Sequence, residues 1–334
     1  MLEADVEVDR RDFTVRAAFG VAPGERLALF GPSGAGKTTI LEAIAGLLPP
    51  RRGSVVLGGR VLTRTEAPRC AVPPWRRRVG LLRQDPALFP HLSVRQNLTY
   101  APGAAARGEE LIEIAGRLGI SGLLDDRPAR LSGGQAHRVA LGRLLLSHCD
   151  ALLLDEPYTG LDASLRHDLT DLVRELVAAR QVPSVLVAHE LAAAQAFADR
   201  LAVLDRGQVL QVGSPSEVVA TPARRRVAEL VGYRSFVPVT RDSPGGPVAG
   251  VHPDRVAAGA QPGRGMVLAG PVRSCRPSGA GWEAGIEAAG TVVPVRLPDR
   301  PPADGAELVV TLLDPPCYGP DGALLAQHMG QVRT

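Results

Sequence analysis

The chain has no long apolar run and no leader-like N-terminus. No stretch of about 18 consecutive apolar residues occurs, the length that a membrane-spanning helix needs. The first ten residues, MLEADVEVDR, carry acidic side chains and lack the apolar core of a secretory signal. We therefore expect a cytosolic protein. If it acts at the membrane, it must dock onto the transmembrane segments of another subunit.

Cysteine and lysine are scarce. The four cysteines lie far apart without a C-x-x-C pair, which argues against a zinc site and favours free thiols in a reducing compartment. Lys37 is the only lysine among 38 lysine and arginine residues. Two compatible explanations stay open: a coding bias towards arginine, and a need at position 37 for a compact point charge on a flexible stem.

A strong excess of one charge is also missing. The formal net charge is +3, and acidic and basic residues are interspersed. This mild balance gives no reason to expect a nucleic-acid partner. The short basic runs Arg51-Arg52 and Arg76-Arg77-Arg78 are interpreted as solvated loop charges.

Residues 1–232 alternate short apolar runs with helical patterns. Arg26–Phe30 is an apolar run ended by Gly31, and an amphipathic stripe over residues 40–48 follows it. Further predicted strands are Val79–Arg83, Ala151–Asp155, Ser184–Ala188 and Leu201–Leu204. Strand–helix alternation of this kind predicts an α/β domain with a largely parallel sheet.

The composition changes after Tyr233, where proline, glycine and valine dominate and the helical periodicity fades. Residues 242–247, DSPGGP, are typical of a turn or linker. Two alternating runs, 282–288 and 293–297, flank Gly290 and predict a hairpin, and Glu307–Leu313 is another strand candidate. Residues 233–334 are therefore expected to form a linker and a small all-β barrel.

The strongest motif is GPSGAGKT, residues 31–38, which matches G-x-x-x-x-G-K-[ST] between a predicted strand and a predicted helix. Its glycines let the backbone wrap with N–H groups pointing inward, and the helix adds its positive end. Lys37 is expected to reach the β- and γ-phosphates of ATP, and the Thr38 hydroxyl to bind Mg²⁺. The expected nucleotide-binding residues here are Gly31, Pro32, Ser33, Gly34, Ala35, Gly36, Lys37, Thr38 and Thr39.

A second motif, ALLLDEP at residues 151–157, is an apolar strand that ends in two carboxylates. A lone carboxylate at such a place is often a helix cap. Here Asp155 is expected to hold Mg²⁺, and Glu156, one residue further, to polarise a water molecule.

Two more segments belong to the same pattern. LSGGQ at residues 131–135 opens a helix, where exposed N–H groups and the Ser132 hydroxyl predict an anion site. A plain helix cap by Ser132 is the alternative. His189 ends the strand Ser184–Ala188, and a lone histidine there is ordinarily structural.

In order and spacing, the P-loop, Gln84, LSGGQ, LLLDEP, Leu161-Asp162 and His189 resemble the nucleotide-binding subunits of ATP-binding-cassette (ABC) transporters. The resemblance covers residues 1 to about 232. It implies a P-loop ABC ATPase domain with a helical subdomain at about 85–145. The C-terminal residues 233–334 then resemble a regulatory barrel of the OB/TOBE type.

The resemblance also implies a mechanism. Two copies would pair head to tail around two ATP molecules. Glu156 would be the general base, Gln84 would contact Mg²⁺ and the attacking water, His189 would touch the γ-phosphate, and Asp162 would lie at the subunit interface. The implied Mg²⁺ ligands are Thr38, Gln84 and Asp155. The residues that would reach the ATP of the second copy are Ser132, Gly133, Gly134 and Gln135.

One element of the family pattern is missing. Where the family often has an aromatic residue that stacks on adenine, this chain has Val8, Asp9 and Arg10. Phe13 is the nearest aromatic residue, and it is equally well interpreted as an apolar strand residue.

An ATPase followed by a β-barrel resembles importers, and the short N-terminus and the segment from Arg77 to Val94 favour the molybdate group. Asp85–Tyr100 resembles the part that grips a membrane subunit. The implied partners are an integral-membrane permease and, indirectly, an extracytoplasmic substrate-binding protein, with the chain on the cytoplasmic face of the cell membrane. Importers of sulfate, ferric iron or polyamine stay open, as does a soluble ABC ATPase.

Overall fold

The computed structural model describes residues 1–101, 108–158, 161–239, 246–261, 263–279, 281–299 and 303–325. The chain divides into two compact units, the N-terminal unit (Met1–Pro215) and the C-terminal unit (Ser216–Thr334). Across the described ranges, no helix combines the length and the apolar character needed to cross a membrane.

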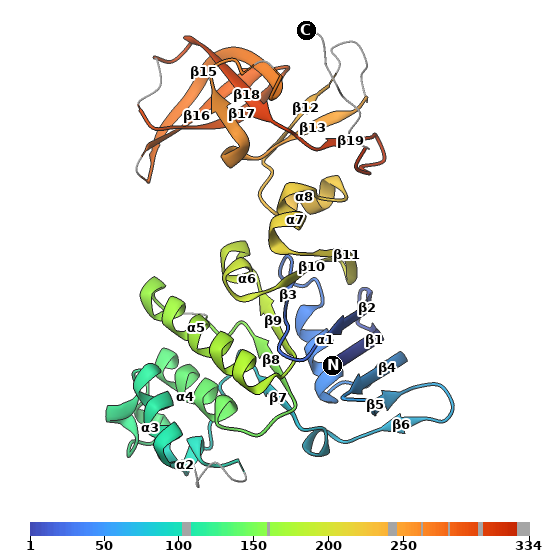
Figure 1. Ribbon diagram of the computed structural model, residues 1–334, viewed down its shortest axis with the longest axis vertical. Coiled ribbons are helices and arrows are strands. Elements are labelled where there is room, and N and C mark those ends of the chain that lie inside the picture. The colour runs from blue at the N-terminus through green and yellow to red at the C-terminus, as the bar shows by residue number, and fades with distance from the viewer. Residues whose placement is uncertain are drawn as a thin grey trace. The chain divides into compact units, whose positions relative to one another are not determined.

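The N-terminal unit is built on one large mixed sheet (Figure 1). Its strands are β1 (Leu2–Asp9), β2 (Thr14–Val21), β3 (Arg26–Phe30), β4 (Arg52–Leu57), β5 (Arg60–Arg64), β6 (Cys70–Ala71), β7 (Val79–Leu82), β8 (Ala151–Asp155), β9 (Ser184–Ala188), β10 (Arg200–Asp205) and β11 (Gln208–Gly213). They lie side by side in the order β6-β5-β4-β1-β2-β11-β10-β3-β9-β8-β7. Neighbours in the run β10-β3-β9-β8-β7 are parallel, and β1, β2, β4, β5 and β6 form antiparallel pairs.

The parallel strands sit in the centre of the core. Every residue of β8 and β9 is buried, as is every residue of β3 except its first. Strands buried on both faces read as continuous apolar runs, which is why the sequence predicts these three to the residue. Helix α1 (Lys37–Ala45) buries Ile40, Leu41 and Ile44 in the same core.

The remaining described α-helices of this unit are α2 (Val94–Leu98), α3 (Gly108–Arg117), α4 (Gly133–Leu145), α5 (Ala163–Arg180) and α6 (Leu191–Phe197). Helix α4 packs closely on its neighbours at Gly142. A Cβ at that position would stand 2.7 Å from the Leu118 side chain and 2.8 Å from that of Leu98. A larger residue there would push the helices apart.

Arg77 corrects one sequence interpretation. The basic run 76–78 predicts solvated loop charges, yet Arg77 is only 4% exposed. Its guanidinium donates to the carbonyls of Ile44 at 2.8 Å and Val72 at 2.8 Å, and to the Thr63 hydroxyl at 2.9 Å. The group caps the C-terminal end of α1, where free carbonyls favour a cation.

The C-terminal unit begins earlier than the composition suggests, at residue 216 rather than 233. Helices α7 (Pro215–Ala220) and α8 (Arg225–Leu230) lead into it. The Tyr233 hydroxyl donates to the Val219 carbonyl at 3.0 Å, and the Tyr318 hydroxyl donates to the Pro222 carbonyl at 3.1 Å. These bonds join the helical segment to the strands that follow, so it folds with them despite its helical composition.

Two small antiparallel sheets complete the C-terminal unit. Their strands are β12 (Ser235–Pro238), β13 (Val248–Val251), β14 (Val256–Ala258), β15 (Gly265–Ser278), β16 (Gly281–Ala288), β17 (Thr291–Leu297), β18 (Glu307–Leu313) and β19 (Cys317–Tyr318). The orders are β12-β13-β19 and β14-β18-β15-β16-β17. The edge strands β14 and β17 contact each other, which curls the larger sheet towards a barrel. The predicted hairpin at Gly290 and the strand Glu307–Leu313 are confirmed.

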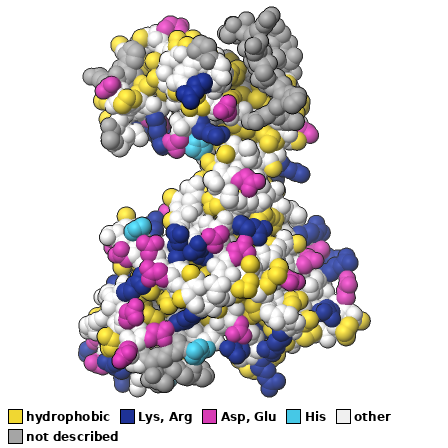
Figure 2. Space-filling model, in the orientation of Figure 1, with side chains coloured by type: hydrophobic (Ala, Val, Ile, Leu, Met, Phe, Trp, Pro, Cys, Tyr) yellow, Lys and Arg dark blue, Asp and Glu magenta, His cyan; other side chains and the backbone are white. Residues whose placement is uncertain are grey.

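Charged side chains of both signs are mixed on the face of the N-terminal unit seen in Figure 2. Opposite charges of this unit also pair, such as Arg26 with Asp199 at 2.6 Å and Arg16 with Glu7 at 3.2 Å, wherever on its surface they lie. Pairing of neighbouring opposite charges leaves no large field of one sign on that face.

Candidate nucleotide-binding and hydrolytic site

The predicted site residues follow neighbouring parallel strands at one edge of the sheet. Phe30 of β3 pairs with Ala188 of β9, and Val187 of β9 pairs with Asp155 of β8. Gly31, His189 and Glu156 each directly follow one of these parallel strands. They therefore lie close together at the same edge of the sheet. The carboxyl edge of a parallel sheet is where ligands bind in open α/β folds.

The P-loop leaves β3 in a tight path that only glycine permits at two points. A Cβ at Gly31 would stand 2.1 Å from the Leu204 carbonyl oxygen. Gly36 has φ 102°, and a Cβ there would stand 2.7 Å from the Val15 side chain. Ala35 donates to the Pro32 carbonyl at 3.2 Å, which closes the turn.

The N-terminus of α1 opens onto this loop without a capping side chain. Gly36 is the cap residue, no side chain accepts from the first turn, and no acidic residue stands in that turn. The first N–H groups of a helix lack intrahelical partners and carry partial positive charge. A Cβ at Gly34 would meet no atom within 4 Å, so the loop is open on that side. This arrangement fits a phosphate group.

Lys37 lies within the curve of the loop. Its ammonium donates to the Gly31 carbonyl at 2.8 Å and to the Pro32 carbonyl at 2.9 Å, and the residue is 6% exposed. Burial lowers the pKa of Lys37, and the nearby carboxylates of Glu156 and Asp155 oppose that shift. The result is a desolvated cation held beside the phosphate cradle.

Thr38 and Asp155 form the next pair. The Thr38 hydroxyl donates to Asp155 Oδ1 at 3.2 Å. Asp155 is 5% exposed, and its burial raises the pKa of the carboxyl group, although the bond from Thr38 works in the opposite direction. A hydroxyl and a carboxylate are the hard oxygen ligands that Mg²⁺ prefers, and they leave most of its coordination sphere for water and phosphate oxygens. The donor set therefore fits the ion.

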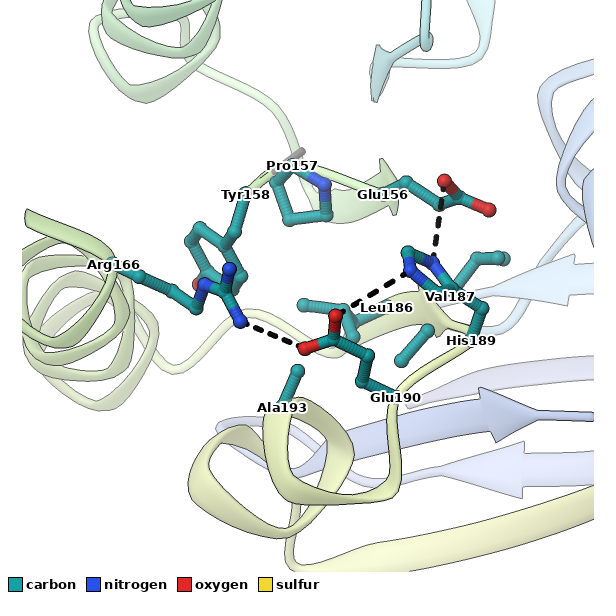
Figure 3. Close-up of a pocket in the computed structure, with 10 residues that line it drawn as sticks. Glu156, Pro157, Tyr158, Arg166, Leu186, Val187, His189, Glu190 and Ala193 are labelled. Atoms are coloured by element: carbon teal, nitrogen blue, oxygen red, sulfur yellow. Dashed lines mark hydrogen bonds and ion pairs between the residues drawn. The ribbon is translucent and has the colours of Figure 1, made fainter. Parts of the chain in front are cut away.

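Glu156 and His189 face each other across the ends of β8 and β9 (Figure 3). His189 Nδ1 lies 3.4 Å from Glu156 Oε2. Glu156 has φ 51°, in the left-handed region that costs a non-glycine residue energy. Such strain persists where the surrounding structure fixes it, and it is common at functional sites.

Glu190 and Arg166 extend this group, and sequence reasoning missed both. Glu190 Oε2 pairs with Arg166 Nη1 at 2.7 Å, and Glu190 Oε1 lies 3.7 Å from His189 Nε2 (Figure 3). They line a cavity of about 110 Å³ together with Glu156 and His189. The signal in the sequence was only the placement of Glu190 directly after His189.

Gln84 follows β7, which pairs in parallel with β8 through Leu82 and Leu154. By this register Gln84 stands level with Glu156 at the same sheet edge. Its side chain is exposed.

The LSGGQ segment lies on a different element. Ser132 caps α4: its hydroxyl accepts from the Gln135 N–H at 3.3 Å, and its own N–H donates to Gln135 Oε1 at 2.8 Å. The alternative of a helix cap is thus realised in full as a capping box. Cβ atoms at Gly133 and Gly134 would meet nothing within 4 Å, so the backbone is open to an approaching group.

Two other predicted positions are also fixed by local bonds. Asp162 caps α5 and accepts from the Leu165 N–H at 3.0 Å. The Phe13 ring packs on the turn at Gly207, where a Cβ would come within 2.8 Å of it. Phe13 packs against the core as an apolar residue, but it directly precedes β2 and is not part of the strand.

The sheet order and the phosphate-cradling loop define the N-terminal unit as a P-loop nucleotide-binding domain. Residues 15–159 match the family described as ABC transporter. A solved structure described as the ATP-binding subunit of an ABC transporter superposes with a TM-score of 0.57 at 28% identity, over 69% of this chain and 94% of that one.

Two similar proteins are both described as import ATP-binding proteins, and their names give different cargoes. The iron(III) import ATP-binding protein of Mesorhizobium japonicum is 41% identical over 66% of this chain. The molybdenum import ATP-binding protein of Mycobacterium tuberculosis is 42% identical over 68% of it. The chain spans 61% and 63% of the length of these two proteins.

Proposed function

We propose that this chain is the ATP-hydrolysing subunit of an ABC importer, with an oxyanion, molybdate, as cargo. The observation that carries the ATPase role is the convergence of Lys37, the Thr38–Asp155 pair and the Glu156–His189 pair at one sheet edge. Each pair joins residues that are far apart in the sequence and supplies a different requirement of phosphoryl transfer.

ATP binds with its phosphates in the P-loop. Backbone N–H groups of the loop and the start of α1 cradle the β-phosphate, and Lys37 leaves the carbonyls of Gly31 and Pro32 to reach the β- and γ-phosphates. Thr38 and Asp155 would hold Mg²⁺, because a hydroxyl and a carboxylate suit a hard divalent cation. When bound, the ion neutralises charge on the phosphate oxygens.

Glu156 acts as the general base on the attacking water. His189, 3.4 Å from Glu156, would touch the γ-phosphate. Gln84, which follows β7, would contact the ion and the attacking water. The strained backbone of Glu156 fixes the direction of its carboxylate, and fixed geometry is most of what an enzyme supplies to this reaction.

The site is completed by a second copy of the chain. Within one chain, Ser132 and Gln135 bond to each other at the tip of α4, and the backbone of Gly133 and Gly134 is open. In a head-to-tail homodimer these groups donate to the ATP held by the partner's P-loop, so hydrolysis requires closure. Asp162 lies in the same interface.

Partners in the membrane follow from the importer role. Asp85, Phe89, Tyr100 and Arg143 line a cavity of about 300 Å³ between β7 and α4, and this cavity receives a helix of the permease. An extracytoplasmic binding protein delivers the cargo to that permease. The iron(III) relative supports ferric iron as the second candidate cargo.

ATP binding is tested through the single lysine. Since Lys37 is the only lysine, an amine-reactive reagent modifies only Lys37 and the N-terminal amine, and mass spectrometry separates the two. We expect Mg·ATP to protect Lys37 and leave the N-terminus reactive. Glu156→Gln should retain the protection. Equal labelling of Lys37 with and without Mg·ATP would contradict the proposal that ATP binds at the P-loop.

The cargo is tested by cellular uptake of labelled molybdate, sulfate and ferric iron in cells that carry the wild type or Glu156→Gln. Selective loss of molybdate uptake in the variant supports the proposal. Loss of iron or sulfate uptake alone keeps the importer and changes its cargo. Glu66→Gln is the matched control, because Glu66 is exposed and lies outside the site. No change in any of the three uptakes would overturn the assignment of an oxyanion or iron cargo.

A further inference from the structure

The two ring nitrogens of His189 each face a carboxylate. Nδ1 lies 3.4 Å from Glu156, and Nε2 lies 3.7 Å from Glu190 Oε1 (Figure 3). Glu190 follows His189 directly and stands at the start of α6. Its backbone therefore brings the carboxylate beside the ring without any contribution from a distant segment.

The other oxygen of Glu190 is held from a different element. Arg166 lies in the first turn of α5, and its Nη1 donates to Glu190 Oε2 at 2.7 Å. Its Nη2 lies 3.4 Å from the Leu161 carbonyl, at the segment that begins α5. One guanidinium thus spans Glu190 and the Leu161 backbone, a geometry suited to its planar fork.

We propose that Arg166 and Glu190 are positioning residues that hold the His189 ring in its working orientation and tie it to the start of α5. This inference rests on the proposed ATPase activity. Arg166 fixes Glu190, and Glu190 fixes Nε2 of His189. The ring then presents Nδ1 to the side of Glu156, where the proposed γ-phosphate site lies. A second contact that sets the ring orientation of a functional histidine is a common device.

The cavity beside His189 explains why a second residue is needed to fix the orientation of its ring. Apolar side chains of Leu186, Val187 and Ala193 form part of its wall, and they offer the imidazole no hydrogen bond. Arg166 Nε is buried, and among the described residues it has no hydrogen-bond partner. The cavity leaves space into which an untied ring can turn. Of the described groups near the ring, Glu190 supplies the contact at Nε2.

A role in overall stability would be small. The side chains of Arg166, Glu190 and His189 are 36%, 49% and 48% exposed. Ion pairs at such exposure contribute little to the free energy of unfolding, because water screens them and ordering two long side chains costs entropy. Loss of the pair should therefore appear in the rate of hydrolysis rather than in the melting temperature.

The test compares steady-state ATP hydrolysis by full-length wild type, Glu190→Ala and Arg166→Ala. We expect Glu190→Ala to lower kcat about 10- to 100-fold with the KM for ATP within about 2-fold, because a small misplacement slows chemistry more than binding. Arg166→Ala should give a smaller loss in the same sense. Glu175→Ala is the control: it removes the Arg117 ion pair from the same helix α5, away from the site.

The decisive comparison uses a His189→Ala background under single-turnover conditions. If Glu190 acts through His189, adding Glu190→Ala there should change the rate less than 2-fold. The charge swap Arg166→Glu with Glu190→Arg should restore the ion pair and leave kcat low, since it places a cation beside Nε2. Rescue by the swap, additive losses in the His189→Ala background, or an unchanged kcat in Glu190→Ala would each overturn the inference. An inactive wild type, or an active Glu156→Gln, would instead overturn the ATPase proposal.

Discussion

Thr38 and Asp155 stand 117 positions apart in the sequence, yet the hydroxyl of one donates to the carboxylate of the other at 3.2 Å. The parallel register brings them together: residues 31–36 lead from the end of β3 to the start of α1, and β8 lies beyond β9 in the same sheet. The pair is buried enough that the ionised carboxylate loses much of its hydration, which raises the pKa of Asp155.

We expect Asp155→Asn to abolish ATP hydrolysis and to stabilise the fold at pH 7. The raised folded-state pKa means that the native state binds the proton more tightly than the unfolded chain, so ionisation above about pH 4 costs stability. The neutral amide escapes this cost while it keeps a hydrogen-bond acceptor for Thr38. Residues at functional sites commonly reduce the stability of the fold in exchange for activity.

Melting temperatures of both proteins between pH 4 and pH 8 check this expectation. The gain in melting temperature of the variant should shrink as the pH falls towards 4, because the wild-type carboxyl then becomes protonated and is also neutral. A variant that is less stable than the wild type at pH 7 would show that Asp155 stabilises the fold in its ionised form.

Ser132 caps α4, and we propose for it a second role as a phosphate contact in the dimer. Ser132→Asp keeps the cap, because aspartate is as good an N-cap as serine, but it brings a negative charge towards the partner's ATP. We expect the melting temperature to change little and the rate of ATP hydrolysis to fall about 100-fold or more. Ser93→Asp, at the equivalent capping box of α2, is the matched control and should hydrolyse ATP normally. Normal ATP hydrolysis by Ser132→Asp would contradict the phosphate contact and show that Ser132 only caps α4.

The sequence was informative where the structure depends on local patterns. The strands β3, β8 and β9 are predicted to the residue because buried parallel strands are unbroken apolar runs ended by Gly31, Asp155-Glu156 and His189. Their side-by-side arrangement then follows from the parallel α/β fold.

What the sequence could not supply depends on contacts between distant segments. Nothing local distinguishes Arg77 from its exposed neighbours Arg76 and Arg78, because its partners lie on α1 and β5. Arg166 has the sequence context of an ordinary helical arginine, and its partner Glu190 is brought near only by the packing of α5 against α6. The Ser132 capping box, in contrast, is readable from residues 132–135 alone.

Arg77 is expected to be essential for the stability of the N-terminal unit. Arg77→Met fills similar volume and leaves the carbonyls of Ile44 and Val72 without a donor, at a cost of about 2–4 kcal/mol in the free energy of unfolding. Arg77→Lys should recover only part of it, since one ammonium cannot span the same acceptors. Urea unfolding measures these differences, with the exposed neighbour in Arg76→Met as the control. Equal stability of the two methionine variants would contradict the capping role.

His137 on α4 makes the stability of the same unit sensitive to mild acid. Burial lowers the pKa of His137, and its contact with the Pro157 carbonyl opposes the shift. Its Nε2 is buried and has no hydrogen-bond partner in the described part of the chain. Because the unfolded chain binds the proton at about pH 6.5 and the native state resists it, stability is lost as the pH falls below that value. His137→Gln cannot take up this proton, so the stability difference between wild type and variant should shift against the wild type between about pH 7 and pH 5. Urea unfolding of both proteins across this range measures the difference, in which the titration of every other histidine cancels. A difference that does not change with pH would show that His137 is protonated equally in the folded and unfolded states.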